Sequence, residues 1–351
     1  MTPALMEGSA ALAEAAIQAG CRFYAGYPIT PSTEILEYMS TRMPEVGGTC
    51  MNAESELEAI GMVWGAAGCG VRSMIASTGQ GISLMQESFA ELANAQIPIV
   101  AVNMSRGQGD YFQATRGGGH GDYRFMVLAP STVQEAVDLT QLAFHLADKW
   151  RNPVQLIGDF LLAHTAESVV IGTPDEAALP PKDWALMGAA GRPAITLSPL
   201  SPREKLTTDV GGRIVAAAEK VHGMRAEEVR VETAWVDDAE LVVVAFGSPA
   251  RFVSYAVQML RERGLRVGFV RPISLWPFPS EAVAAAAERA RAVAVFELNA
   301  GQMIEDVQLA VLGRAPVLPI GGISHDHSGF GVGPALRVEH ILGKIEEAYT
   351  G

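Results

Sequence analysis

The stretch RFYAGYPITPSTEILEYMST, residues 22–41, contains one complete unit of the fold. Residues 22–26 form a short apolar run that is typical of a buried strand, and a loop with two prolines follows it. Pro31 stands where proline commonly starts a helix, so residues 32–41 are predicted to be helical. A strand followed by a loop and a helix is the repeating unit of an α/β protein with a parallel sheet.

The same alternation continues on both sides of an irregular middle. Helices are predicted at residues 5–19, 54–69, 81–93, 132–146, 251–263, 280–291, 302–312 and 334–349. Strands are predicted at residues 48–52, 73–77, 97–103, 125–128, 154–158, 241–246, 266–270, 292–296 and 316–320. Short apolar strands that alternate with helices are typical of parallel sheets covered on both faces.

Six prolines between residues 172 and 203 interrupt this pattern. Proline at that density excludes a regular helix and a central strand there, although residues 205–232 have a partly helical pattern. The sequence therefore predicts an α/β fold class with two doubly wound parallel-sheet domains, at residues 1–171 and 236–351. A Pro-rich linker or arm at residues 172–235 is expected to join them.

The composition fits two globular domains and excludes several classes of protein. Of the 351 residues 49% are hydrophobic and 19% charged, and the net charge is −13. An acidic surface repels phosphate backbones, so nucleic-acid binding is not expected. The longest uncharged apolar run, residues 59–71, has 13 residues, whereas a helix that spans a bilayer needs about 20. Because the N-terminus also lacks a signal-peptide pattern, we expect a cytoplasmic protein that does not enter a membrane.

Cysteine spacing and motifs exclude further classes. Cys21, Cys50 and Cys69 form no CxxC pair, so neither a disulfide framework nor a self-contained Cys₄ iron–sulfur cluster is expected. The sequence has no GxGxxG, GxxxxGK[ST], GxSxG or HExxH motif, which removes the main support for a Rossmann dehydrogenase, a P-loop enzyme, a serine hydrolase or a zincin. His325 and His327 form an HxH pair without a third ligand nearby, which favours a polar loop or a subunit contact. We therefore predict no metal ligands in this chain.

Polar residues gather where the first strand ends. Thr30 offers a hydroxyl near the predicted start of a helix, and such an end favours an anion, for example a carboxylate. The same loop, stiffened by Pro28 and Pro31, also fits a rigid strand-to-helix turn without a ligand. Ligand sites in open parallel sheets form at the carboxyl ends of strands, which places this loop at the expected site.

Three alternating carboxylates, Glu54, Glu56 and Glu58, open the next helix. One interpretation is favourable interaction with the helix dipole in the first turn, with Asn52 as a plausible cap. The helix continues as GMVWGAAGCG, however, which has the pattern of a buried segment. A carboxylate between a strand end and a buried helix is a candidate for proton transfer.

A long glycine-rich loop at residues 101–124 forms the third candidate site. It carries Arg106, Arg116 and Arg124, and arginine suits bidentate capture of a carboxylate or a phosphate. His120 lies among its glycines and is a weaker candidate for contact with a ligand. Long structured loops within compact domains are usually functional.

Together these stretches resemble a known family. AGYPITPSTEI (25–35), AESELEAIGMVWGAAG (53–68), NMSRGQGDYFQATRGGGHGDYR (103–124) and FELNAGQMIEDV (296–307) resemble the alpha subunit of 2-oxoacid:ferredoxin oxidoreductases. The resemblance is closest to the 2-ketoisovalerate (3-methyl-2-oxobutanoate) type and next to the 2-oxoglutarate type. It implies a thiamine diphosphate pyrimidine-binding domain followed by a transketolase C-terminal-like domain. It also implies oxidative decarboxylation of a 2-oxoacid with coenzyme A to acyl-CoA and CO₂, with electrons passing to ferredoxin.

The resemblance assigns roles to single residues. Glu56 matches the family's glutamate that bonds ring nitrogen N1′ of the thiamine pyrimidine, where a buried acid favours the imino tautomer. Glu54 is the rival, because the Glu-x-Glu register makes a slip of two residues easy. Thr30 and Arg106 match residues that contact the substrate. Three further residues are implied to line the thiamine ring: Tyr27, Pro28 and Ile29.

The sequence departs from the family in one loop and supplies only part of the implied site. The loop from SRG to QGDYFQ is longer in the family, so Arg116 is a second candidate beside Arg106 for the substrate carboxylate. Such enzymes commonly hold the pyrophosphate and Mg²⁺ with GDG and NN motifs, and this sequence has neither. The resemblance therefore implies a beta subunit for the pyrophosphate half, and gamma and ferredoxin-like subunits or domains for the Fe–S clusters.

Two other functions stay open at this point. The chain could belong to another thiamine diphosphate enzyme, such as the E1 component of a lipoamide-linked 2-oxoacid dehydrogenase or a transketolase-like protein. It could also be a binding or scaffold subunit without a catalytic role. The identity of the partner distinguishes the first alternative from the alpha subunit implied by the resemblance. The effect of removing the Glu56 carboxylate distinguishes the second alternative from it.

Overall fold

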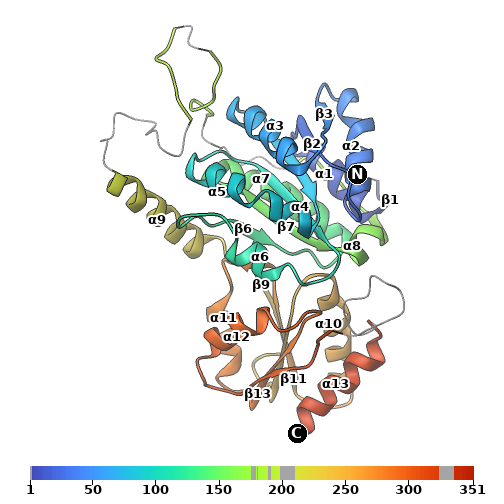
Figure 1. Ribbon diagram of the computed structural model, residues 1–351. Helices are drawn as coiled ribbons and strands as arrows, with labels where there is room; N and C mark the ends of the chain where they lie inside the picture. Colours follow the sequence, from blue (N-terminus) through green and yellow to red (C-terminus); the bar gives the residue numbers. More distant parts are fainter. Residues whose placement is uncertain (1, 175–178, 180, 189–190, 198–209, 324–335) are drawn as a thin grey trace.

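The computed structural model describes the whole chain except residues 1, 175–178, 180, 189–190, 198–209 and 324–335. It contains two sheets of mainly parallel strands flanked by helices (Figure 1). The predicted α/β fold class is therefore confirmed. We call the larger sheet with its helices the first domain, and the smaller sheet with its helices the second domain.

The larger sheet, within the described residues, has seven strands in the order β12-β6-β7-β5-β4-β2-β3. Its strands are β2 (Phe23–Gly26), β3 (Thr49–Asn52), β4 (Ser73–Ser77), β5 (Val100–Ser105), β6 (Met126–Leu128), β7 (Val154–Asp159) and β12 (Ser274–Trp276). All neighbours are parallel except β12, which runs antiparallel to β6. The central strands β4 and β5 are buried along their whole length, which explains their continuous apolar sequences.

Helices cover both faces of this sheet. They are α1 (Gly8–Gln18), α2 (Thr33–Glu45), α3 (Glu56–Gly68), α4 (Gly79–Leu84), α5 (Gln86–Asn94), α6 (Tyr111–Arg116), α7 (Val133–Trp150) and α8 (Phe160–His164). Helix α1 packs against α2 and α7, whereas α3 packs against α4 and α5. The loops at the carboxyl ends of β2 to β5 lead into these helices, and they include the three candidate stretches.

The second domain is built in the same way. Its sheet has the order β14-β13-β10-β11-β9 among the described residues. Its elements are β9 (Val231–Ala234), β10 (Leu241–Ala245), α10 (Gly247–Glu262), β11 (Val267–Pro272), α11 (Ser280–Ala287), β13 (Ala292–Phe296), α12 (Met303–Val311), β14 (Val317–Pro319) and α13 (Val338–Thr350). Only β9 runs antiparallel to its neighbour in this described sheet.

Several short strands differ from the elements expected from the sequence. Residues 4–7 form strand β1 (Ala4–Glu7), which pairs with β8 (Ala166–Val169), so the first helix starts at Gly8 rather than at residue 5. The segment 172–235, expected as a linker, contains strand β9, whereas its helix α9 (Val210–Glu227) agrees with the partly helical pattern predicted for residues 205–232. Strand β12 comes from the second half of the chain and yet extends the first sheet. Each short strand depends on pairing with a distant segment, which local periodicity does not encode.

The two domains share a hydrophobic core. One cluster of buried side chains extends from the first domain to Val244, Phe246 and Val270 of the second. A separate cluster lies between the second sheet and helices α10 and α13. None of the helices in the described ranges combines the length and the apolar character that crossing a membrane requires.

Candidate functional site

The carboxyl ends of four neighbouring strands meet at one edge of the first sheet. Gly26 at the end of β2 lies opposite Asn52 of β3, and Ser77 at the end of β4 lies opposite Asn103 of β5. The YPITP loop, the start of α3, the start of α4 and the loop that carries Arg106 all leave from this edge. This edge is where open parallel sheets bind ligands.

Only one of the three carboxylates at the start of α3 is buried. Helix α3 begins at Glu56, and the N-cap Ser55 accepts a hydrogen bond from the backbone N–H of Glu58. Glu56 is 6% exposed, and the Ser77 hydroxyl donates to its Oε1 at 3.0 Å. Glu54 and Glu58 are exposed. The structure therefore supports Glu56, rather than its rival Glu54, as the carboxylate of the site.

Glycines allow the chain to approach these carboxylates closely. A Cβ atom added at Gly81 would lie 2.0 Å from Ser77 Oγ and 2.2 Å from Glu56 Oε1. A Cβ atom at Gly79 would lie 2.7 Å from an oxygen of Asp110. Real Cβ atoms essentially never show such contacts, so Gly81 leaves room for Glu56 and Ser77, and Gly79 leaves room for Asp110.

Two buried polar side chains at the same edge each have an atom without a hydrogen-bond partner within the described structure. They are Thr78, whose Oγ1 accepts and donates no hydrogen bond, and Asn103, whose Oδ1 accepts none. Thr78 is 1% exposed and Asn103 is 0% exposed. Burial of an unpaired polar atom costs free energy, typically about 1–3 kcal/mol, unless a ligand or water pairs with it. The edge is therefore suited to a polar ligand.

Arg106 and the YPITP loop are in contact. Arg106 Nε donates to the backbone carbonyl of Thr30 at 3.2 Å, and the Arg106 side chain is half-buried. Ile29 O accepts hydrogen bonds from both the backbone N–H and the hydroxyl of Ser32, which closes the loop onto α2. Tyr27, Pro28 and Thr30 are exposed, and Ile29 is half-buried. The structure thus brings these predicted site residues together beside the edge.

Arg116 lies elsewhere. Its guanidinium forms two hydrogen bonds of 3.0 Å with the carboxylate of Asp306 on α12, and it stacks over the Phe112 ring. Burial alone would lower the pKa of Arg116, but Asp306 outweighs burial and raises this pKa above its usual value. Arg116 is therefore engaged at the contact between the two domains.

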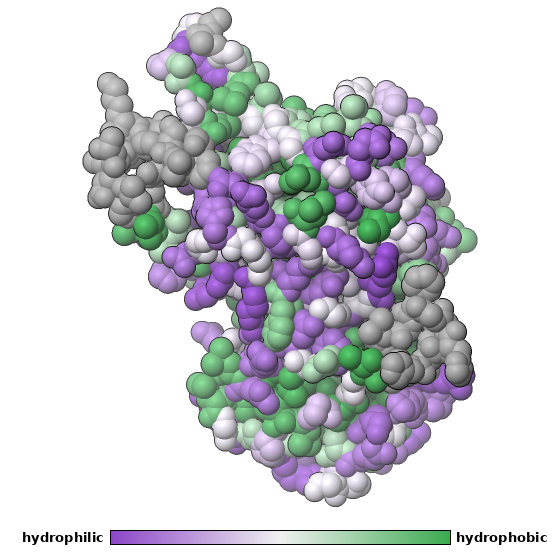
Figure 2. All heavy atoms as spheres, viewed as in Figure 1, coloured by the Kyte–Doolittle hydropathy of each residue, from purple (hydrophilic) through white to green (hydrophobic). Residues whose placement is uncertain are grey.

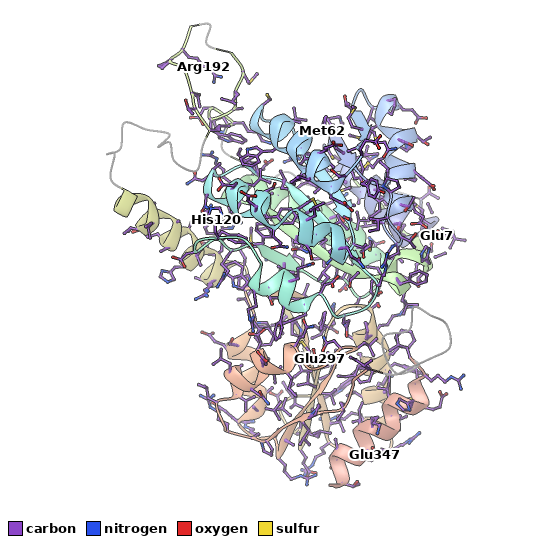
Figure 3. All side chains as sticks on the ribbon, viewed as in Figure 1. Glu7, Met62, His120, Arg192, Glu297 and Glu347 are labelled. Atoms are coloured by element: carbon purple, nitrogen blue, oxygen red, sulfur yellow. The ribbon has the colours of Figure 1, made fainter. Side chains whose placement is uncertain are left out.

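The candidate histidines are His120 and the pair His325 and His327. His120 Nε2 lies 3.0 Å from Glu91 Oε1, its side chain is 60% exposed, and Figure 3 places it towards α9. His325 and His327 lie outside the described residues. Within the described ranges, no group of three or more histidines, cysteines or acidic residues is arranged to hold a metal ion.

Sequence reasoning missed Ser77, Thr78 and Gln108. Ser77 and Thr78 follow directly after the apolar run of β4, and polar residues at the end of a buried parallel strand are a usable signal. Gln108, which is 3% exposed, contacts the second domain. Its partners lie more than a hundred residues away, so no local pattern indicates its role.

Comparison with known proteins agrees with this geometry. Residues 14–225 match the family described as pyruvate flavodoxin/ferredoxin oxidoreductase, thiamine diphosphate-binding. Residues 239–327 match core domain II of pyruvate:ferredoxin oxidoreductase. These two matches correspond to the first and second halves of the chain.

Curated relatives match over most of their length. The ketoisovalerate oxidoreductase subunit VorB of Methanothermobacter thermautotrophicus is 43% identical over 323 residues, which covers 88% of this chain and 90% of the relative. The 2-oxoglutarate synthase subunit KorA of the same organism is 40% identical over 363 residues, which covers 91% of this chain and 95% of the relative.

Solved structures extend the comparison. The 2-oxoglutarate:ferredoxin oxidoreductase from Magnetococcus marinus, solved with 2-oxoglutarate, coenzyme A and succinyl-CoA, is similar with a TM-score of 0.83 and 25% identity. The similarity covers 99% of this chain but only 65% of that chain. A split-gene transketolase, with a TM-score of 0.60 and 13% identity, shares the fold. The resemblance inferred from the sequence is confirmed, and the chain belongs to the 2-oxoacid:ferredoxin oxidoreductase family as a subunit with a thiamine diphosphate-binding domain.

Proposed function

We propose that this chain is the alpha subunit of a thiamine diphosphate-dependent 2-oxoacid:ferredoxin oxidoreductase. Its first domain would hold the pyrimidine half of the cofactor at the carboxyl edge of the larger sheet. The observation that carries this proposal is the buried Glu56 carboxylate, held by the Ser77 hydroxyl at 3.0 Å. Glu56 is the residue that the family resemblance assigns to ring nitrogen N1′.

The residues at the edge fit such a ring. The aminopyrimidine of thiamine is flat and carries hydrogen-bond donors and acceptors around its rim. The edge offers a buried carboxylate and the unpartnered polar atoms of Thr78 and Asn103. Tyr27 and Ile29 add apolar surface beside them. Glu56 would hold a proton at N1′, while Tyr27, Pro28 and Ile29 would line the ring.

Each side chain then has a defined role. When bound, thiamine diphosphate supplies the carbon nucleophile and the electron sink that decarboxylation of a 2-oxoacid requires. Glu56 is buried and oriented by the Ser77 hydroxyl, so its carboxyl group would meet N1′ from a fixed position. Arg106 and Thr30 face the same edge and would bind the carboxylate and keto group of the substrate. We assign the carboxylate to Arg106 rather than to Arg116, because Arg116 is already paired with Asp306.

We infer that the substrate is a branched-chain 2-oxoacid or 2-oxoglutarate, and that coenzyme A accepts the acyl group. The relatives named for ketoisovalerate and 2-oxoglutarate support both acids at similar identity, 43% and 40%. A panel of 2-oxoacids, assayed with coenzyme A and ferredoxin on the purified complex, would separate them. The three free cysteines fit a cytoplasmic location for this enzyme.

The proposed assembly includes a beta subunit that binds the pyrophosphate and Mg²⁺, gamma and ferredoxin-like subunits with the Fe–S clusters, and ferredoxin as electron acceptor. Apolar side chains around the edge support a partner there, and Figure 2 shows apolar residues among polar ones on the face that carries α4. The loop, strand and helices that meet at this edge carry exposed apolar side chains: Tyr27 (38% exposed), Met51 on β3 (40%), Leu57 and Met62 on α3 (53% and 38%) and Leu84 on α4 (50%).

The decisive test replaces one carboxylate in the natively purified complex. Glu56→Gln keeps the size of the side chain but removes its acidity, so we expect turnover to fall by about 10²–10⁴-fold with the subunits still assembled. Glu54→Gln is the matched control, because Glu54 is exposed, and it should change turnover less than about twofold. Mass spectrometry of the same preparations identifies the partners.

Three results would contradict the proposal. Full activity of the Glu56→Gln complex would favour a scaffold subunit. Loss of activity in Glu54→Gln alone would move the catalytic role to the rival carboxylate. Co-purification with a lipoamide acyltransferase, in place of subunits with cysteine-rich cluster motifs, would favour a lipoamide-linked dehydrogenase.

A further inference from the structure

The segment that follows Arg106 is docked on the second domain. We call residues 108–116 the docked segment. It lies against the carboxyl ends of β10 and β13, which are adjacent parallel strands with Ala245 opposite Phe296. In a doubly wound sheet this edge is the usual place for a small ligand. Here the chain fills it with its own residues.

Gln108 is joined to the second domain by hydrogen bonds from its side chain and its backbone. Its Nε2 donates to the backbone carbonyl of Phe246 at 2.8 Å, and its Oε1 accepts from the backbone N–H of Leu298 at 2.8 Å. Its own backbone carbonyl accepts a bond of 3.0 Å from Asn299 Nδ2. The residue is 3% exposed, so both ends of the side-chain amide are paired away from water. The amide therefore spans two neighbouring strand ends.

The FELNAGQ stretch at residues 296–302 builds the receiving surface. Gln302 donates to Gly109 O and accepts from Phe112 N–H, both at 2.7 Å. The Glu297 carboxylate accepts the backbone N–H groups of Gln302, Met303 and Ile304 at the start of α12. Figure 3 shows Glu297 at the junction of the two domains. The chain's own carboxylate thus occupies the helix N-terminus that would otherwise attract an anion.

Arg106 precedes Gln108 by two residues, and its side chain is held less firmly than that of Gln108. The hydrogen bond that joins its side chain to the YPITP loop is 3.2 Å long and exposed to solvent. The backbone on its far side is fixed by the buried contacts of Gln108. Only Gly107 separates the two residues, so a shift of Gln108 moves the backbone that carries the guanidinium.

We propose that Gln108 is a positioning residue, through which the second domain holds Arg106 in place for the carboxylate of the substrate. The inference deepens the proposed function and rests on the role assigned there to Arg106. It also explains why the FELNAGQ stretch is built around the docked segment, because the second domain then acts on the substrate site without touching the substrate.

Substitution of Gln108 in the assembled complex tests the proposal. Gln108→Glu keeps the acceptor for Leu298 N–H but turns a carboxylate oxygen towards Phe246 O, where the two acceptors repel. We expect KM for the 2-oxoacid to rise tenfold or more, with the dissociation constant of thiamine diphosphate within twofold of wild type. Dye-linked turnover of 3-methyl-2-oxobutanoate and of 2-oxoglutarate supplies KM, and titration calorimetry supplies the cofactor affinity.

One further variant controls for a general loss of contact between the domains, and another is a second test of the docked segment. Arg251→Gln removes the Arg251–Glu167 ion pair, which joins the same domains outside the docked segment. It should leave KM within twofold. Gln302→Ala keeps Gln108 but removes two contacts of the docked segment, and it should raise KM about threefold. Gln302→Ala also tests the proposal should Gln108→Glu fail to fold.

The double variant separates this inference from the proposed function. If Gln108 acts through Arg106, then Arg106→Lys combined with Gln108→Glu raises KM no more than Arg106→Lys alone. If the effects of the two substitutions on KM multiply, the positioning role of Gln108 is overturned while the proposed role of Arg106 survives. An unchanged KM in Gln108→Glu would also overturn the positioning role. An unchanged KM in Arg106→Lys alone would instead overturn the proposed role of Arg106.

Discussion

At the scale of single residues, the site depends on which of three neighbouring carboxylates is buried. Helix α3 begins at Glu56, so Glu54 precedes the N-cap Ser55 and stays in solvent. From the sequence, the family resemblance favours Glu56 and keeps Glu54 as its rival, because the Glu-x-Glu register makes a slip of two residues easy. In the structure Ser77 and Gly81, which come from a different strand and helix, lie against Glu56, and this contact supports the role proposed for Glu56.

Gly81 leads to a prediction with a matched control. In Gly81→Ala the new methyl would lie 2.2 Å from Glu56 Oε1, so the carboxylate or α4 must shift. Overpacking of this kind costs about 1–3 kcal/mol, and we expect thiamine diphosphate to bind about tenfold or more weakly. In Gly65→Ala, on α3, the methyl meets nothing within 4 Å. That variant should keep the affinity and gain roughly 1 kcal/mol of stability. Calorimetric titration of both complexes measures the affinity for thiamine diphosphate. Equal affinities would show that cofactor binding does not require the space that Gly81 leaves beside Glu56.

At the scale of elements, the sequence predicted the long and the buried segments and missed contacts between distant ones. The parallel strands β4, β10 and β13 lie within or on their predicted ranges, and β5 overlaps its predicted range but ends two residues later, at Ser105. Strands β1, β8, β9 and β12 have three or four residues each and are held by distant partners. Side-chain contacts between distant segments are equally hard to predict. Arg116 pairs with Asp306, and nothing near Arg116 in the sequence indicates this partner.

An ion pair between α7 and β11 gives a prediction for stability against pH. Arg271 is 5% exposed and donates to both carboxylate oxygens of Glu135, at 2.9 and 2.6 Å. Burial alone would raise the pKa of Glu135, but the hydrogen bonds and charge of Arg271, with those of Ser131, outweigh burial and lower it. A lowered native pKa stabilises the fold above the ordinary glutamate pKa of 4.5, and this contribution is lost as the pH falls through the native value.

We therefore expect Glu135→Gln to cost about 2–3 kcal/mol at pH 7, and clearly less at pH 3.5. Urea denaturation of wild type and variant at both pH values measures the two differences. The control is Glu346→Gln, whose partner Arg263 is 50% exposed, and it should cost under about 1 kcal/mol at either pH. A difference for Glu135→Gln that stays constant or grows at low pH would show that the ion pair is not its cause.

At the scale of the whole molecule, the two domains share one core, and their two carboxyl edges differ. Their core is continuous, and Gln108, Arg116 and Tyr111 connect them by hydrogen bonds. The carboxyl edge of the second sheet is filled by the docked segment, whereas the edge of the first sheet keeps unpartnered polar atoms and a rim of exposed apolar side chains. The first edge is therefore the one that a cofactor and a partner subunit would complete.

Leu57 tests whether the partner covers that edge. It follows Glu56 directly and is 53% exposed, so Leu57→Glu should leave the fold of this chain intact. If the beta subunit buries Leu57, the charge loses its water on assembly, and the dissociation constant for that subunit should rise about tenfold or more. Leu309→Glu, on α12 and 68% exposed, is the control and should bind the subunit as wild type does. Sedimentation velocity of tagged chain and partner compares the three proteins. Equal association of both variants, or weakening by Leu309→Glu alone, would place the partner on another face and leave the apolar rim beside Glu56 without the role argued for it.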